Sequence, residues 1–214
     1  MVNISSLETT FGTLWLAANE HGLCRLALPA TKEHERFHQW VARRTSFPLS
    51  LDSPGRATPL GGSQAGGRGP GRGCLPTPHP QNDYGRSLSL TLFHEGRENK
   101  ILALAKAELS EYLTGRRHHF TVPLDLDGSA FFRQVWEALF AIPYGGTLTY
   151  AALAAQLHRP RAFRAVGSAC AKNPMPLIIP CHRAVGSNGS LTGFAGGLAM
   201  KESLLRMEGA IGKV

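Results

Sequence analysis

Several features that would assign this sequence to a class are missing from it. It has no run of about 18 uncharged apolar residues, which excludes a membrane-spanning helix. Its start lacks a basic stretch followed by a long apolar one, so we expect no secretory signal. No Cys-x-x-Cys pair occurs, which argues against a zinc ribbon or a thioredoxin-type site. We therefore expect a cytoplasmic protein whose cysteines are free thiols: Cys24, Cys74, Cys170 and Cys181.

Acidic residues are the scarcer charged class. Fifteen Asp and Glu stand against 23 Lys and Arg, which gives a net charge of +8 and a pI near 9.7. This balance favours a polyanionic partner such as nucleic acid, although a solvated basic surface has the same composition. Residues 54–80 lack acids altogether and hold eight Gly, six Pro and three Arg. We interpret them as a flexible insertion, and a passive loop is favoured over a basic tether for DNA.

The segments around this insertion carry regular apolar patterns. Strand-like runs from Phe11 and Leu23, joined by turn-prone residues 19–22, predict a hairpin. Residues 32–44 look helical, and a further strand-like run starts at Ser87. Apolar residues spaced four apart then predict a helix that ends near a glycine: Ile101, Ala105, Leu109, Leu113 and Gly115.

The second half of the chain reads as short helices. Ser129 is placed to cap one whose apolar face would carry Phe132, Val135, Trp136, Leu139 and Phe140. Thr149 is placed to cap another, and residues 161–171 form the next. The last two resemble a helix-turn-helix with its second helix at DNA, but an ordinary helical hairpin fits the pattern equally well.

Residues 176–183 carry the candidate chemistry, since they read Pro-Leu-Ile-Ile-Pro-Cys-His-Arg. They predict a short apolar strand that delivers Cys181 rigidly, among basic side chains that lower a thiol pKa: His182, Arg183 and Lys201. Neighbours on a regular strand face opposite ways, so His182 reaches Cys181 only if the chain turns or a water bridges them. Alone, the pair fits either a nucleophile with its base or a structural cysteine beside a surface histidine.

Ordered motifs over residues 123–209 resemble the O6-alkylguanine-DNA alkyltransferase family, the methylated-DNA–protein-cysteine methyltransferases. They are Ile-Pro-Tyr-Gly-Gly-Thr-Leu-Thr-Tyr from 142, Arg-Ala-Val-Gly from 164, Asn-Pro at 173, Leu-Ile-Ile-Pro-Cys-His-Arg-Ala-Val-Gly from 177, Gly-Ser-Leu-Thr-Gly-Phe-Ala-Gly-Gly from 189 and Lys-Glu-Ser-Leu-Leu-Arg-Met-Glu-Gly from 201. The resemblance implies an α+β protein: an N-terminal ribonuclease H-like α/β domain at 1–122, then a C-terminal winged helix-turn-helix domain at 123–214.

The resemblance also implies an activity. Members of the family transfer an alkyl group once, irreversibly, from O6 of guanine to their own cysteine, without a cofactor, and we expect no metal here. The implied partner is double-stranded DNA carrying O6-alkylguanine, bound by a monomer that associates with the nucleoid if the source is bacterial. No glycine-rich phosphate loop or methyl-donor fingerprint speaks for another chemistry.

Catalytic roles follow from the same resemblance. Cys181 thiolate would attack the alkyl carbon, with His182 as general base through water and Glu208 orienting His182. Tyr150 would crowd the 3′ phosphate and protonate guanine N3, and Arg164 would fill the stack vacated by the flipped nucleotide. Plainer interpretations are a phosphate contact for Arg164, core packing for Tyr150 and an exposed helix end for Glu208.

Other positions would hold the guanine or support the site. The Ala195 N–H would face O6, and the carbonyls of Cys181 and Ala184 would accept from the exocyclic amine. Lys201 would line the pocket, the alternative being a solvated helix lysine. The remaining assigned positions are Phe194 and Gly196 at the substrate, Asn173 as the tie between the helix-turn-helix and the active-site strand, and Arg183 in the local fold.

Three positions depart from the family pattern. Phe194 stands where many members have tyrosine, Ala195 where some have serine, and Phe163 replaces a small residue beside Arg164. Rival functions are a lesion-binding relative without repair, a Cys-His hydrolase and a helix-turn-helix transcription factor. The first lacks the cysteine that Cys181 supplies here, the second would need an oxyanion-hole signature, and the third would show operator specificity.

Overall fold

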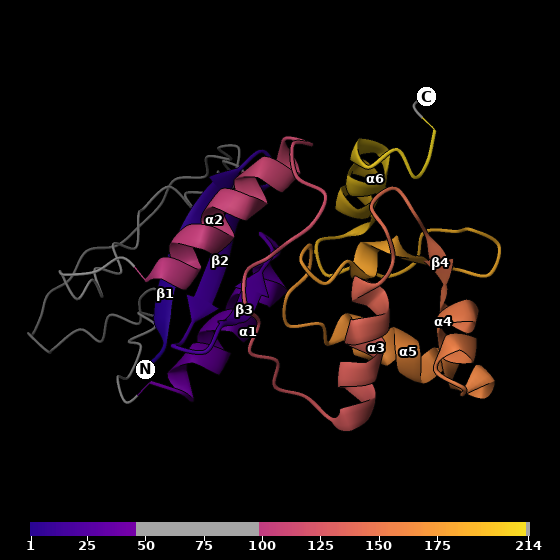
Figure 1. Ribbon diagram of the computed structural model, residues 1–214, viewed down its shortest axis with the longest axis horizontal. Helices are drawn as coiled ribbons and strands as arrows, with labels where there is room; N and C mark the ends of the chain where they lie inside the picture. The colour runs from indigo at the N-terminus through magenta and orange to yellow at the C-terminus, as the bar shows by residue number, and fades with distance from the viewer. Residues whose placement is uncertain (46–98, 213–214) are drawn as a thin grey trace, which may run out of the picture. The chain divides into compact units, whose positions relative to one another are not determined.

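The structure is a computed structural model that describes residues 1–45 and 99–212 (Figure 1). The insertion expected at 54–80, Cys74 within it, and the strand-like run from Ser87 lie outside the described residues. Helices and strands are mixed in the part that is described. None of its helices is both long and apolar enough to cross a membrane.

The N-terminal residues form a three-stranded antiparallel sheet in the order β1 (Asn3–Thr9), β2 (Gly12–Ala18), β3 (Leu23–Ala27). β2 and β3 confirm the expected hairpin, whereas β1 was not expected. Alternation along β2 sends Leu14 and Leu16 into one apolar cluster and Ala17 into another, as the two-residue period of a strand requires.

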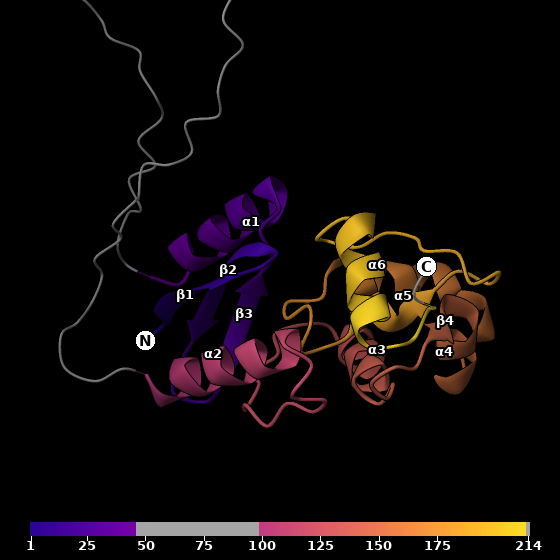
Figure 2. The same cartoon turned by 90° about the horizontal axis from the view of Figure 1, so that it is seen from above.

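Two helices cover opposite faces of this sheet (Figure 2). α1 (Thr31–Ala42) packs Phe37 and Val41 against the Ala17 face. α2 (Lys100–Leu113) packs its apolar side against the other face. Asn99 caps α2 by accepting from two backbone N–H groups, and Gly115 follows its end with φ 72°, as predicted.

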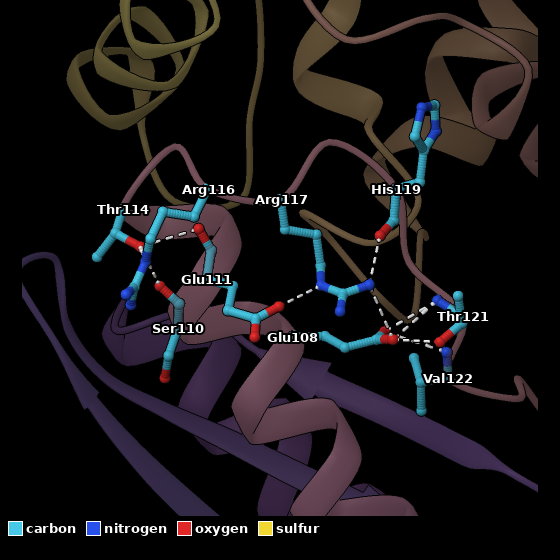
Figure 3. A network of polar contacts seen from close by, with 9 residues as sticks. All are labelled: Glu108, Ser110, Glu111, Thr114, Arg116, Arg117, His119, Thr121 and Val122. Carbon is cyan, nitrogen blue, oxygen red and sulfur yellow. Dashed lines mark hydrogen bonds and ion pairs between the residues drawn. The ribbon is translucent and has the colours of Figure 1, made fainter.

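A buried carboxylate in α2 holds the segment that follows the helix against its last turns (Figure 3). Glu108 accepts hydrogen bonds from the backbone N–H groups of Thr121 and Val122 and from the Thr121 hydroxyl. Arg117 completes the clip, with Nη1 3.2 Å from Glu108 and Nε 2.7 Å from Glu111. Residues 114–122 are thereby tied to the last turns of α2.

The C-terminal residues are mainly helical (Figure 1). The elements are α3 (Ala130–Phe140), β4 (Leu148–Thr149), α4 (Tyr150–Gln156), η1 (Pro160–Ala162), α5 (Phe163–Ala171), η2 (Cys181–Arg183), β5 (Ala184–Val185) and α6 (Leu198–Met207). Ser129 and Thr149 cap α3 and α4 as predicted. The apolar face expected for α3 is partly wrong, because Phe140 is 49% exposed. It lies about 100° around the helix from buried Leu139.

The strand expected before Cys181 is also wrong. Leu177 has φ 76°, and Ile179 N–H donates to the Met175 carbonyl at 2.8 Å, so these residues form a tight turn. Prolines at 174, 176 and 180 lack the N–H donors that a strand ladder uses. The turn continues into the 3₁₀ helix η2, which begins at Cys181.

Candidate active site

Cys181 is the first residue of η2 and is only 5% exposed. Asn173, just after α5, fixes the preceding turn: its Nδ2 donates to the Ile179 carbonyl at 2.8 Å, and its Oδ1 accepts from Met175 N–H at 3.0 Å. Burial raises the pKa of the Cys181 thiol, while Asn173 and Lys201 act in the opposite direction. Because burial outweighs these groups, the Cys181 thiol stays protonated at neutral pH unless a base takes its proton.

His182 follows Cys181 in η2 and is fully buried. Its Nε2 lies 3.0 Å from Glu208 Oε1 and 3.3 Å from the Tyr112 hydroxyl oxygen. Nδ1 is buried and has no hydrogen-bond partner among the residues that the structure describes. Burial lowers the pKa of His182, although Glu208 opposes this, so the ring is neutral at pH 7. With a proton on Nε2 for Glu208, Nδ1 keeps its lone pair as an acceptor.

Glu208 caps the C-terminus of α6 with its carboxylate buried, which excludes the exposed helix-end interpretation. Arg183 donates to it from Nε and Nη2, both at 2.9 Å. Burial by itself would raise the pKa of Glu208, but hydrogen bonds from His182, Arg183 and Tyr112 lower it to about 2. The backbone N–H of Gly145, a residue with φ 75°, donates to Glu208 Oε2 at 3.3 Å. A Cβ there would lie 2.8 Å from the Glu208 carbonyl oxygen.

Tyr112 is a member of this cluster that sequence reasoning missed. It lies near the end of α2, is fully buried, and donates its hydroxyl to Glu208 Oε1 at 2.6 Å. Burial and the Glu208 charge raise the pKa of the phenol, which keeps it a proton donor. Its position three residues after Leu109 gives the same pattern as a core aromatic, so no local signal marks it.

Lys201 is buried as well, which overturns the solvated alternative. Its Nζ donates to the carbonyls of Ala184 at 2.6 Å and Thr192 at 2.7 Å. The Tyr150 hydroxyl lies 3.4 Å from the same Thr192 oxygen. Lys201 Nζ also stands 5.9 Å from the centroid of the Tyr150 ring. Lysine and tyrosine are thus linked through one carbonyl.

The other predicted residues surround this cluster or lie on the surface. The ring of Phe194 meets the His182 ring edge-on, with centroids 6.2 Å apart. Ala195 and Gly196 are half-buried in the segment before α6. Arg164 is exposed near the start of α5, with its guanidinium carbon 5.7 Å from the centroid of the Phe163 ring. Within the described ranges, no three His, Cys, Asp or Glu side chains are grouped as metal ligands.

The sequence of this chain is similar to a family profile and to several proteins of known function. A family profile described as the 6-O-methylguanine DNA methyltransferase DNA-binding domain matches residues 130–210. The inducible methylated-DNA–protein-cysteine methyltransferase of Bacillus subtilis is 48% identical over 101 residues, which cover 47% of this chain and 56% of that protein. The Methanosarcina barkeri enzyme of that name is 47% identical over 109 residues, covering 51% of this chain and 69% of that protein. This chain belongs to the methylated-DNA–protein-cysteine methyltransferase family.

A methyltransferase structure supports the same assignment over a longer part of the chain. The crystal structure of Mycobacterium tuberculosis OGT in complex with DNA has a TM-score of 0.62 and 28% identity, covering 97% of this chain and 92% of that one. The mixed α/β fold of the present chain is therefore similar to that of a known relative. The matched profile includes Cys181, His182 and Glu208.

Proposed function

We propose that this protein repairs O6-alkylguanine in double-stranded DNA by moving the alkyl group once, irreversibly, onto Cys181. Family membership supports the reaction class, and one structural observation carries the assignment of residues. Glu208 holds Nε2 of His182, while Nδ1, on the residue that follows Cys181, is left as a buried acceptor. A raised thiol pKa beside a neutral imidazole fits general-base activation.

The proposed reaction uses side chains of the site and one bridging water. His182 takes the thiol proton through a water, and the sulfur of Cys181 attacks the alkyl carbon. The sulfur–carbon bond forms as the carbon–O6 bond breaks, and the electron pair passes to guanine. The Tyr150 hydroxyl gives its proton to N3, and Glu208 stabilises the imidazolium that forms on His182. Solvent then carries the proton of the imidazolium back to the Tyr150 phenolate, so that both side chains end neutral. The product is a thioether that water does not cleave, so each protein molecule acts once.

Access to O6 requires the nucleotide to leave the duplex. Arg164, exposed on α5, fills the gap by stacking. The Ala195 N–H faces O6, and the carbonyls of Cys181 and Ala184 accept from the exocyclic amine. The Ala184 oxygen already accepts from Lys201, but a carbonyl has a second lone pair for the guanine.

The finer architecture belongs to the same proposal. Residues 1–122 form the ribonuclease H-like α/β domain, and residues 123–214 form the winged helix-turn-helix domain, with α4 and α5 as its helices. Support comes from the sheet covered by α1 and α2, and from the exposed basic start of α5. The protein acts as a monomer, with a cytoplasmic or nucleoid location.

The test is the mass of the intact protein after incubation with a duplex that contains one O6-methylguanine. We expect a gain of one methylene that maps to the Cys181 peptide and is lost in Cys181→Ala. Cys170→Ala is the matched control, because burial and the neighbouring Cys181 raise the pKa of the Cys170 thiol to about 12. An unchanged mass with folded protein and bound duplex would refute the proposal.

A further inference from the structure

The first residue of α5 presents a large apolar ring to solvent. Phe163 is 44% exposed, whereas Val166 and Ala169 of the same helix are buried. An exposed ring contributes little to the core, since burial of apolar area is what stabilises the fold. Phe163 also replaces the small residue of the family pattern, so the ring calls for an explanation outside the core.

The surroundings of this ring are strongly basic. Arg159, Arg161 and Arg164 are all exposed within five residues of Phe163. An open depression lined by Arg159, Pro160, Arg161 and Ala162 comes directly before it in the chain. Residues 138–201 contain no Asp or Glu. This surface therefore complements a polyanion, and an aromatic ring among phosphate-binding arginines is typical of sites where bases stack.

We propose that Phe163 is a second stacking side chain that works beside Arg164 at the gap left by the extruded nucleotide. The two are consecutive at the N-terminus of α5, the end of a recognition helix that meets DNA. The Arg164 guanidinium lies 5.7 Å from the ring centroid, so a cation and a ring stand together on the surface. Aromatic side chains on which unstacked bases rest are a recurring feature of proteins that bind single-stranded nucleic acid. This inference rests on the proposed function and names what the surface recognises: the unstacked base beside the gap.

Phe163→Ala tests the inference, measured as affinity for a duplex with one O6-methylguanine. Loss of one base–aromatic contact should weaken binding about tenfold. The ratio of the Cys181 methylation rate with duplex to the rate with free O6-methylguanine base should fall by a similar factor. Phe163→Tyr keeps the ring and should restore both, whereas Phe163→Leu should not.

Two variants separate stacking from other effects. Phe140→Ala removes another exposed ring, 49% exposed on α3 and outside the arginine-rich residues 159–164, and should bind and react as wild type does. Arg161→Ala removes a charge, so the slope of log affinity against log salt should fall by about one, whereas Phe163→Ala should leave that slope unchanged.

The outcomes distinguish this inference from the proposed function. If Phe163→Ala binds the duplex as wild type does, or if its lower affinity follows from a lower unfolding temperature, the stacking role is overturned. If Phe163→Leu matches Phe163→Tyr, apolar area rather than stacking explains the ring, and the inference fails. A wild-type protein that binds through Phe163 but leaves Cys181 unmodified refutes the methyl transfer and keeps the inference.

Discussion

Glu108 and Glu208 are two buried glutamates with opposite surroundings. Around Glu108 the donors are backbone N–H groups, a hydroxyl and a guanidinium (Figure 3). Around Glu208 they include the imidazole of His182 and the phenol of Tyr112. Both carboxylates are satisfied, as burial of a charge requires. The difference is that only the Glu208 cluster contains a group that changes protonation near neutral pH.

That difference separates a structural clip from the proposed proton relay. The Glu108 partners cannot pass a proton on, so this glutamate only holds residues 114–122 against α2. The Glu208 partner His182 has a second nitrogen without a hydrogen-bond partner among the described residues, and His182 directly follows Cys181 in the chain. A buried glutamate therefore supports the fold at Glu108 and, in the proposed mechanism, supports the chemistry at Glu208.

Glu208→Gln should have the largest effect. It keeps the shape but removes the charge that Arg183 and His182 require, which leaves a buried guanidinium without its counter-ion. We expect methyl transfer about 100-fold slower and a loss of about 3–5 kcal/mol in unfolding free energy. Single-turnover kinetics and denaturant unfolding measure the two, with kinetics taken where the variant is folded. A rate close to wild type would contradict the relay.

Acid should destabilise the protein through the same cluster. The pKa of His182 is lowered from 6.5, so the unfolded chain binds the extra proton first and stability falls as pH drops below 6.5. The pKa of Glu208 is lowered from 4.5 to about 2, so a further loss follows between those values. The Glu208 part is of the order of 3 kcal/mol. Unfolding measured against pH checks this, and Glu208→Gln should lack the second loss.

Glu108→Gln should affect stability alone. Hydrogen bonds to a charged acceptor are weakened, so the unfolding free energy should fall by about 2 kcal/mol. Methyl transfer, measured where both proteins are folded, should keep its wild-type rate, because the polar partners of Glu108 among the described residues all lie within residues 114–122. A rate loss comparable with that of Glu208→Gln would erase the distinction between the two glutamates.

Tyr112→Phe should slow methyl transfer about fivefold, much less than Glu208→Gln, because only one hydrogen bond to the Glu208 carboxylate is lost. The negative charge on Glu208 then interacts more strongly with an imidazolium, so the pKa of His182 rises. Transfer requires neutral His182, and the acidic limb of the pH–rate profile should move to higher pH. A merely structural role would lower the unfolding temperature and leave that limb in place.

Local patterns predicted much of the fold. Alternation at 11–16 and 23–28 predicted β2 and β3, and caps at Ser129 and Thr149 predicted α3 and α4, because these signals act within a few residues. The prediction of a strand before Cys181 was wrong because Leu177 adopts a positive φ. Nothing in an apolar residue such as leucine indicates a positive φ from sequence. The prediction that Phe140 is buried was wrong because Phe140 lies beside the buried face of α3 and not on it.

The residues of the site also divide into those that sequence motifs indicate and those that only the folded structure shows. Motifs near the reactive cysteine brought Cys181, His182 and Glu208 into consideration, and the structure places the last two in contact. Tyr112 was missed because it reaches Glu208 across 96 residues of sequence, and only tertiary packing sets that contact. The net pKa direction of the Cys181 thiol was not predictable from its basic neighbours, because burial is a property of the folded chain.

In the proposed function, Cys181 accepts one alkyl group and keeps it. A titration of the protein with a growing excess of O6-methylguanine duplex tests this directly, by counting repaired guanines per protein molecule. We expect a plateau at one repaired guanine for each folded molecule, with S-methyl on Cys181. Continued repair beyond that plateau, or a plateau reached with Cys181 unmodified, would contradict it.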